Sequence, residues 1–125
     1  MARVLVIEDE PTINMILDIA LSQEGYQVIT APDGRTGLEL MQRQPLPEIV
    51  LVDLLMPGIS GKTVVKTMSS HAELRKIPVV IISGSLPSSE NLPPKGSYQA
   101  LICKPFDLTE VINIVGSLTL AGRVA

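Results

Sequence analysis

The segment IVLVDLLMPG, residues 49–58, determines how the rest of the chain is interpreted. Its first four residues form a continuous apolar run, which is typical of a strand buried on both faces of a parallel sheet. Asp53 ends this run, and the breakers Pro57 and Gly58 predict a loop soon after it. The segment therefore predicts a carboxylate at the carboxyl end of a buried strand.

Short apolar runs occur on either side of this segment, separated by stretches with helical spacing. The runs at residues 4–7, 26–30, 78–82 and 100–103 predict four more strands, and helices are expected to begin near Pro11, Gly34, Lys62 and Asp107. Strands that alternate with helices indicate parallel βαβ units with right-handed crossovers. We therefore expect an α/β fold with a doubly wound, five-stranded parallel sheet and helices on both faces; the order 2-1-3-4-5, one of those that such sheets adopt, would make the first and third strands neighbours.

Residues 83–99 interrupt this alternation. They lie where a fourth helix would connect the last two strands, but they contain Pro87, Pro93 and Pro94. Proline lacks the backbone N–H group and disfavours the helical conformation in the residue before it. We therefore expect the fourth helix to be short or missing.

Length and composition limit the class of protein. With 125 residues, 46% hydrophobic and 18% charged, the chain is expected to form a single globular domain over residues 1–125, with no second domain. A net charge of -3 with scattered Lys and Arg argues against direct nucleic-acid binding. The single cysteine, and the absence of a leader or of an apolar stretch of about 20 residues, predict a cytoplasmic protein without membrane insertion.

Five charged or reactive side chains are expected at the carboxyl ends of strands: Glu8, Asp9, Asp53, Ser83 and Lys104. In a doubly wound sheet these ends share one edge, where ligands bind. Two unit charges about 4 Å apart repel by about 4 kcal/mol at an effective dielectric constant of about 20, so three carboxylates need a cation. Oxygen ligands with room for water and phosphate favour Mg²⁺. The pattern thus predicts a magnesium site to which Lys104 adds positive charge.

Each of these signals has a simpler interpretation when it is taken alone. Acids at residues 8–10 favour a helix N-terminus through capping and the helix dipole, and an aspartate before a Pro-Gly turn is a common turn residue. Ser83 alone would be a loop hydroxyl, and Lys104 alone a solvated cation. Their combination on one sheet edge favours a common site.

Four motifs together resemble the receiver domain of two-component response regulators. They are the Glu8-Asp9 pair, residues 53–58 with Gly61, the Ser83-Gly84 pair and the triplet at residues 104–106. The resemblance covers essentially the whole chain, and it implies a flavodoxin-like fold and a single receiver domain over residues 1–125 with no effector domain.

The resemblance also implies a role for each site residue. Asp53 would accept a phosphoryl group, and Mg²⁺ would be bound by Glu8, Asp9, Asp53 and the backbone carbonyl of Leu55. Ser83 would bond to the phosphoryl group. Lys104 would pair with Asp53 or with the phosphate, across a Lys104-Pro105 bond that is usually cis in this family.

The implied function is that of a phospho-accepting signalling switch. A histidine kinase or a histidine phosphotransfer protein would phosphorylate Asp53, and the change in conformation would regulate a downstream protein partner. The domain would not be an enzyme beyond self-catalysed phosphorylation and dephosphorylation, because Leu55 stands where haloacid-dehalogenase-type phosphatases carry a second aspartate. The alternative is a receiver-like interaction module that phosphorylation no longer controls.

Two features depart from the receiver pattern. Leu101 stands where receivers usually carry Tyr or Phe, and together with the proline-broken fourth helix it predicts that the conformational signal leaves by a different or weaker route. Ile114, Leu120 and Ala121 add apolar area to the last helix. This area favours either a homodimer or partner contact, or packing of the C-terminal tail on the body.

Two further side chains capable of chemistry are not assigned to the site. Cys103 is expected to be a buried small hydrophobe on the last strand. His71 has no second His or Cys near it and is expected to lie on the surface. Neither is expected to take part in catalysis.

Overall fold

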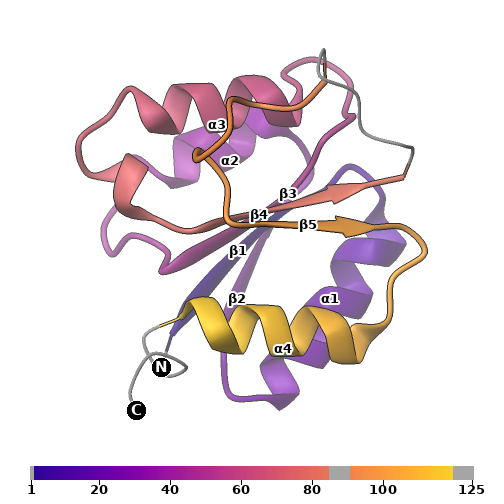
Figure 1. Cartoon of the computed structure of the whole chain (residues 1–125). Coiled ribbons are helices and arrows are strands. Elements are labelled where there is room, and N and C mark those ends of the chain that lie inside the picture. The colour runs from indigo at the N-terminus through magenta and orange to yellow at the C-terminus, as the bar shows by residue number, and fades with distance from the viewer. Residues whose placement is uncertain (1, 85–90, 120–125) are drawn as a thin grey trace.

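The strands of the protein form one parallel sheet. The computed structural model describes residues 2–84 and 91–119 of the chain. Its strands are β1 (Arg3–Ile7), β2 (Gln27–Ala31), β3 (Ile49–Asp53), β4 (Val79–Ser83) and β5 (Ala100–Cys103). Their order is β2-β1-β3-β4-β5 and all neighbours are parallel (Figure 1), which confirms the predicted topology.

Helices cover both faces of this sheet (Figure 1). One face carries α1 (Pro11–Gln23) and α4 (Leu108–Leu118). The other carries α2 (Gly34–Leu40), α3 (Gly61–Ser69) and the short 3-10 helix η1 (Leu74–Lys76). This two-sided cover is the doubly wound arrangement that alternating strands and helices predict.

Side-chain caps determine where two of these helices begin. Asp33 Oδ1 accepts a hydrogen bond from Thr36 N at 2.7 Å at the start of α2. Ser60 Oγ accepts one from Thr63 N at 3.3 Å at the start of α3. Each oxygen satisfies a backbone N–H group that has no partner within its own helix.

The sheet divides the hydrophobic core into two layers. Alternate residues of β3 point to opposite faces, so Val50 and Val52 join the cluster under α2 and α3, whereas Ile49 and Leu51 join the cluster under α1 and α4. All residues of β3 are buried, including Asp53 at its end. A carboxylate is therefore held at the end of a strand that is covered on both sides.

The connection from β4 to β5 contains no helix in its described residues, Gly84 and 91–99. Leu92 and Tyr98 instead pack on the core cluster under α2 and α3, and Pro93 is buried. The prediction of a short or missing fourth helix is confirmed for these residues, while Pro87 lies outside the described part of the chain.

The prediction for Cys103 is wrong, because this residue is exposed. β5 is an edge strand, and Cys103 shares with Leu101 the sheet face that a fourth helix would cover. Leu101 itself is half-buried against the core. His71 is exposed, as predicted.

The apolar area of the last helix is only partly free. Ile114 is half-buried and packs against the core cluster under α1 and α4, whereas Leu120 and Ala121 lie outside the described residues. A dimer or partner contact through α4 therefore stays a prediction. Among the described residues, no helix has both the length and the apolar character required to cross a bilayer.

Candidate functional site

The order of the strands brings the predicted site residues to one edge of the sheet. Glu8 follows β1 directly, and β1 is the neighbour of β3, which ends in Asp53. Ser83 ends β4, and its carbonyl oxygen accepts a hydrogen bond from Lys104 N at 2.7 Å. Backbone pairing between adjacent parallel strands therefore aligns these strand ends.

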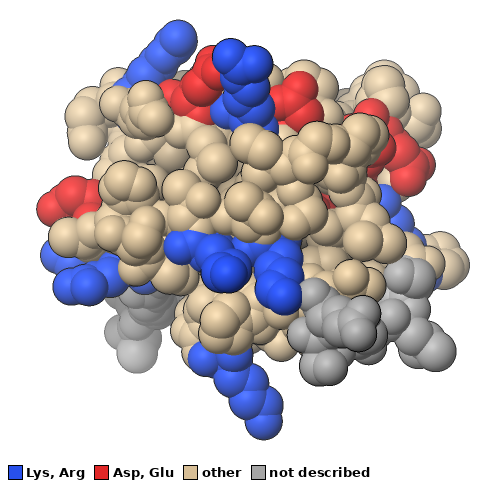
Figure 2. All heavy atoms as spheres, turned by 90° about the horizontal axis from the view of Figure 1, so that it is seen from above, with Lys and Arg blue, Asp and Glu red and all other residues tan. Residues whose placement is uncertain are grey.

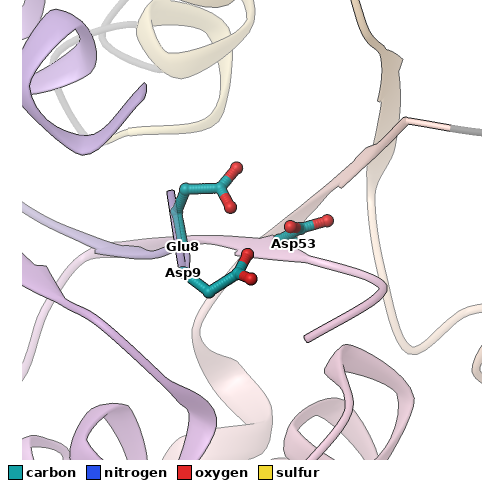
Figure 3. Close-up of side chains that lie close together, drawn as sticks. All are labelled: Glu8, Asp9 and Asp53. Carbon is teal, nitrogen blue, oxygen red and sulfur yellow. The ribbon is translucent and has the colours of Figure 1, made fainter. Parts of the chain in front are cut away.

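Three carboxylates converge at this edge. Oxygen atoms of Glu8, Asp9 and Asp53 all lie within 4.8 Å of one another. Figure 3 shows the carboxylates of Glu8 and Asp9 directed toward the side of Asp53. Glu8 and Asp53 are 0% and 3% exposed, whereas Asp9 is accessible to solvent. The cluster thus has a buried side and an open side.

Lys104 is the cation of this cluster. Its Nζ lies 2.8 Å from Glu8 Oε1, 3.4 Å from Asp53 Oδ2 and 3.4 Å from Glu10 Oε1. The Lys104-Pro105 peptide bond is cis, as the receiver resemblance implies. One ammonium group therefore faces three carboxylates from two segments, the β1–α1 connection and the end of β3.

Burial and crowding perturb the charges at the site. Burial, followed by a hydrogen bond with Asp53, raises the pKa of Glu8 to about 8, although Lys104 opposes the rise. Burial lowers the pKa of Lys104, but the hydrogen bond to Glu8 and the charge of Asp53 outweigh this effect, so that the pKa is raised overall. The protein without a divalent ion therefore has too few positive charges for its acids.

The donor atoms fit a hard divalent cation. Glu8 Oε1 is buried and has no hydrogen bond of normal geometry within the described part of the chain, so the ion pair with Lys104 is its main compensation. Two further carboxylates offer oxygen atoms within reach of the same point. Oxygen donors with an open side for water suit Mg²⁺. The acidic cluster therefore meets the requirements of a magnesium site.

Sequence reasoning missed two contacts of this cluster. Glu10 is at the N-cap position of α1 but caps nothing with its side chain, and it pairs with Lys104 instead. Asn14 Nδ2 donates a hydrogen bond to the Glu8 carbonyl oxygen at 2.6 Å. The run of three acids at residues 8–10 could have indicated the contact between Glu10 and Lys104. The helical spacing of α1 gave no indication that Asn14 would bind the Glu8 carbonyl oxygen.

The carboxylate of Asp53 is nearly buried, with 5% of its side chain exposed. Leu55 N donates a long hydrogen bond of 3.4 Å to Asp53 Oδ1, and the Leu55 side chain is exposed. Ser83 is buried at the end of the neighbouring strand. The N-terminus of α3 packs on the same backbone, because Gly61 N donates to the Leu54 carbonyl oxygen at 3.0 Å.

Known proteins share this sequence pattern. Residues 4–116 match the family described as response regulator receiver domain. The chain is 37% identical over 127 residues to Sensor histidine kinase TmoS of Ectopseudomonas mendocina, with 96% of this chain and 12% of that protein covered. It is 39% identical to Protein PilH of Pseudomonas aeruginosa, with 66% of this chain and 68% of that protein covered. It is 35% identical to Response regulator PleD of Caulobacter vibrioides, with 94% and 26% covered. The chain thus spans a small part of two of these three relatives.

Solved structures share the fold. The chemotaxis protein CheY4 of Vibrio cholerae superposes with a TM-score of 0.85 and 24% identity, covering 94% of this chain and 98% of that chain. The Francisella response regulator 1452 receiver domain gives a TM-score of 0.82 and 26% identity, with 94% and 96% covered. The cluster of Glu8, Asp9 and Asp53 fits the phosphorylation and magnesium site of this family. The chain therefore belongs to the family of response regulator receiver domains.

Proposed function

We propose that this receiver domain is a phosphorylation-controlled switch in which Asp53 accepts a phosphoryl group. The observation that carries the proposal is the convergence of Glu8, Asp9 and Asp53 with Lys104 at the ends of strands that are far apart in sequence. Such crowding of acids around one cation destabilises the resting site, and a divalent ion would offset it. A cluster of this kind serves function at the expense of local stability.

The reaction requires one bond to form and one to break. A carboxylate oxygen of Asp53 attacks the phosphorus of a phosphohistidine, a new P–O bond forms, and the P–N bond breaks. The bonding electron pair stays on the imidazole nitrogen, which then takes up a proton. The product is an aspartyl phosphate, so the site gains about one negative charge and three acceptor oxygen atoms.

The residues around Asp53 have proposed roles in this transfer. Lys104, which already faces Asp53 Oδ2 at 3.4 Å, offsets the charge of the transferring group. The Ser83 hydroxyl donates a hydrogen bond to a phosphoryl oxygen. Glu8, Asp9, Asp53 and the Leu55 carbonyl oxygen would hold Mg²⁺. When bound, this ion would supply positive charge that stabilises the transferring phosphoryl oxygens.

Exposed apolar side chains support a protein as the phosphoryl donor. The exposed large hydrophobic residues of the described chain are Met15, Ile16, Ile19, Leu55 and Leu108. Ile16 and Leu108 line a groove of about 690 Å³ together with Lys104. An apolar rim beside a charged site is typical of a protein contact. We propose that a histidine kinase or histidine phosphotransfer protein docks here and that the loaded domain then regulates a downstream partner in the cytoplasm.

The second candidate is a receiver-like interaction module without control by phosphorylation. The lack of a helix in the described residues between β4 and β5, together with Leu101, favours a changed output, but neither feature alters the acidic cluster or its lysine. The complete site therefore supports the switch as the primary proposal. Its only chemistry would be its own phosphorylation and dephosphorylation.

Mass spectrometry after treatment with acetyl phosphate and Mg²⁺ tests the proposal. The wild-type chain is expected to gain one phosphoryl group, and Asp53→Asn is expected to gain none. Asp18→Asn, which removes a carboxylate of α1 outside the acidic cluster, is the matched control and is expected to behave as wild type. Equal labelling of Asp53→Asn and wild type, or no labelling of the wild type, would contradict the switch and favour the interaction module.

A further inference from the structure

A second groove lies between α3 and the segment that connects β4 to β5. Its volume is about 520 Å³, and none of its lining residues belongs to the acidic cluster. Lys62 and Lys66 of α3 line one side. The other side is formed by Lys95 and by apolar residues that include Leu92 and Tyr98. The groove thus combines an apolar floor with three ammonium groups.

The lysines of this groove have no acidic residue beside them in its described lining. Lys62 and Lys66 are four residues apart on α3, so they lie on the same side of the helix and repel each other. Within the described part of the chain, no Asp or Glu lines the groove, and no ion pair includes Lys66 or Lys95. Figure 2 shows basic side chains across the middle and lower part of the face that carries α3, with acidic ones nearer its edges. A basic surface on a chain of net charge -3 indicates an anionic partner.

The wall opposite α3 is held in place although it is not a helix. Gln99 N donates to the Val79 carbonyl oxygen at 2.8 Å, and Val79 N donates to Gln99 Oε1 at 2.7 Å. Leu92 and Tyr98 pack on the core cluster under α2 and α3. A groove whose walls are already ordered binds a ligand at a lower entropic cost.

Both walls of the groove are attached to the ends of strands that carry the phosphorylation site. The first turn of α3 packs on the Asp53-Leu54 backbone, where an added Cβ on Gly61 would lie 2.8 Å from Leu54 Cα. The other wall belongs to the connection that begins after Ser83 and ends in β5. A structural change at Asp53 or Ser83 can therefore reach each wall through the chain or through packed contacts. Control of the groove by phosphorylation rests on the proposed function.

We propose that this groove binds an acidic segment of a partner protein, in which a large apolar side chain is flanked by Asp or Glu. The apolar floor accepts the side chain, and the ammonium groups of Lys66 and Lys95 pair with the carboxylates. The volume lies within the range of sites that accept a small ligand or a few side chains, about 300–1,000 Å³. Tyr98 is the one aromatic residue in the described lining, so the groove offers no platform on which successive nucleic-acid bases could stack.

Selection from a displayed library of random peptides tests this proposal, with the complete unphosphorylated chain as bait. The selected peptides are expected to be enriched in Asp and Glu around one large apolar residue. Measured by fluorescence anisotropy, their affinity is expected to fall about tenfold or more in the double variant Lys66→Glu/Lys95→Glu and to weaken as salt is added. The control Arg75→Glu/Lys76→Glu has the same change in charge on η1 and should bind as wild type.

Four outcomes would overturn the proposal: no selected peptides, peptides without acidic enrichment, equal binding to the Lys66→Glu/Lys95→Glu variant, or a single-stranded oligonucleotide that displaces the peptides through the same lysines. Circular dichroism of each variant verifies that it is folded. Asp53→Asn is expected to bind the selected peptides, because the groove is present without phosphate. A failure of the groove is therefore distinguishable from a failure of phosphorylation.

Discussion

Lys104 Nζ lies 2.8 Å from Glu8 Oε1, and this ion pair connects the carboxyl end of β5 with the carboxyl end of β1. Two strands, β3 and β4, lie between them. The same ammonium group is 3.4 Å from Asp53 Oδ2, at the end of β3. Lys104 is thus shared between the acid that is proposed to receive phosphate and an acid that is proposed to bind metal, and a phosphoryl group on Asp53 would compete with Glu8 for it.

Replacement of Lys104 by Ala is expected to slow phosphorylation of Asp53 by acetyl phosphate about a hundredfold, which is the usual effect of removing one group that stabilises developing charge. Fold and Mg²⁺ binding should be largely retained, because the side chain lies at the sheet edge and outside both core clusters. The rate is measured by mass spectrometry and the fold by circular dichroism. Lys76→Ala is the control, and normal phosphorylation and signalling in Lys104→Ala would contradict the assigned role.

Mg²⁺ is expected to stabilise the folded chain, because it relieves repulsion among Glu8, Asp9 and Asp53. At a free concentration of about 100 times Kd, the free energy of unfolding should rise by about 2.7 kcal/mol. Thermal unfolding over a series of MgCl₂ concentrations measures this effect without any phosphorylation. Asp9→Asn should raise the MgCl₂ concentration that is needed for a given increase in unfolding temperature, and Asp18→Asn should leave it unchanged. An unfolding temperature that does not depend on Mg²⁺ would remove the metal site.

Substitution of Gly61 by Ala is expected to lower the free energy of unfolding by about 1–3 kcal/mol, because the new Cβ would overlap the Asp53 carbonyl oxygen and the Leu54 backbone. Gly116→Ala is the contrasting change within α4. Its Cβ would have 3.8 Å to the Tyr26 hydroxyl oxygen as its nearest contact, so helix propensity should raise stability by up to about 1 kcal/mol. Urea unfolding compares the two, and a Gly61→Ala variant as stable as wild type would refute the close approach.

The cap at Asp33 is expected to make stability depend on pH in the acid range. Hydrogen bonds from Thr36 hold the pKa of Asp33 below its ordinary value of 3.8. A folded-state pKa that is lowered contributes stability above the ordinary pKa, and this contribution is lost as the pH falls through the folded value. The unfolding temperature of wild type, relative to Asp33→Asn, should therefore fall as the pH is lowered from about 5 to about 2. A difference that does not change with pH would show that the carboxylate charge is irrelevant to the cap.

The exposed apolar side chains of Ile16 and Leu108 are expected to promote phosphoryl transfer from a protein donor but not from a small-molecule donor. The double variant Ile16→Ser/Leu108→Ser should lower the rate of transfer from any phosphohistidine protein that loads the wild-type chain by about tenfold, because apolar contact area is lost. Loading by acetyl phosphate should stay the same, since this small donor needs no protein surface. Equal loss with both donors would indicate damage to the site itself.

Much of the fold and the site was predictable from local patterns. The apolar runs at residues 4–7 and 49–52 predicted two buried strands, and the acids at their ends predicted the carboxylate cluster, because neighbouring parallel strands end at the same edge. Clustered prolines predicted the absence of a regular helix before β5. The missed contacts, by contrast, depend on side-chain directions: helix capping was the simpler interpretation of Glu10, yet its carboxylate turns toward Lys104.

The amino-acid sequence by itself determined the alternation of strands and helices and the identity of the residues at the strand ends, because hydrophobic periodicity and turn chemistry are local properties. Tertiary structure alone decided that Lys104 is shared by Glu8 and Asp53, that Cys103 is exposed, and that Lys95 faces Lys62 and Lys66 across a groove. These features depend on distances between residues far apart in the chain. Such distances are determined by how the helices and the β4–β5 connection pack on the sheet, which no local pattern specifies.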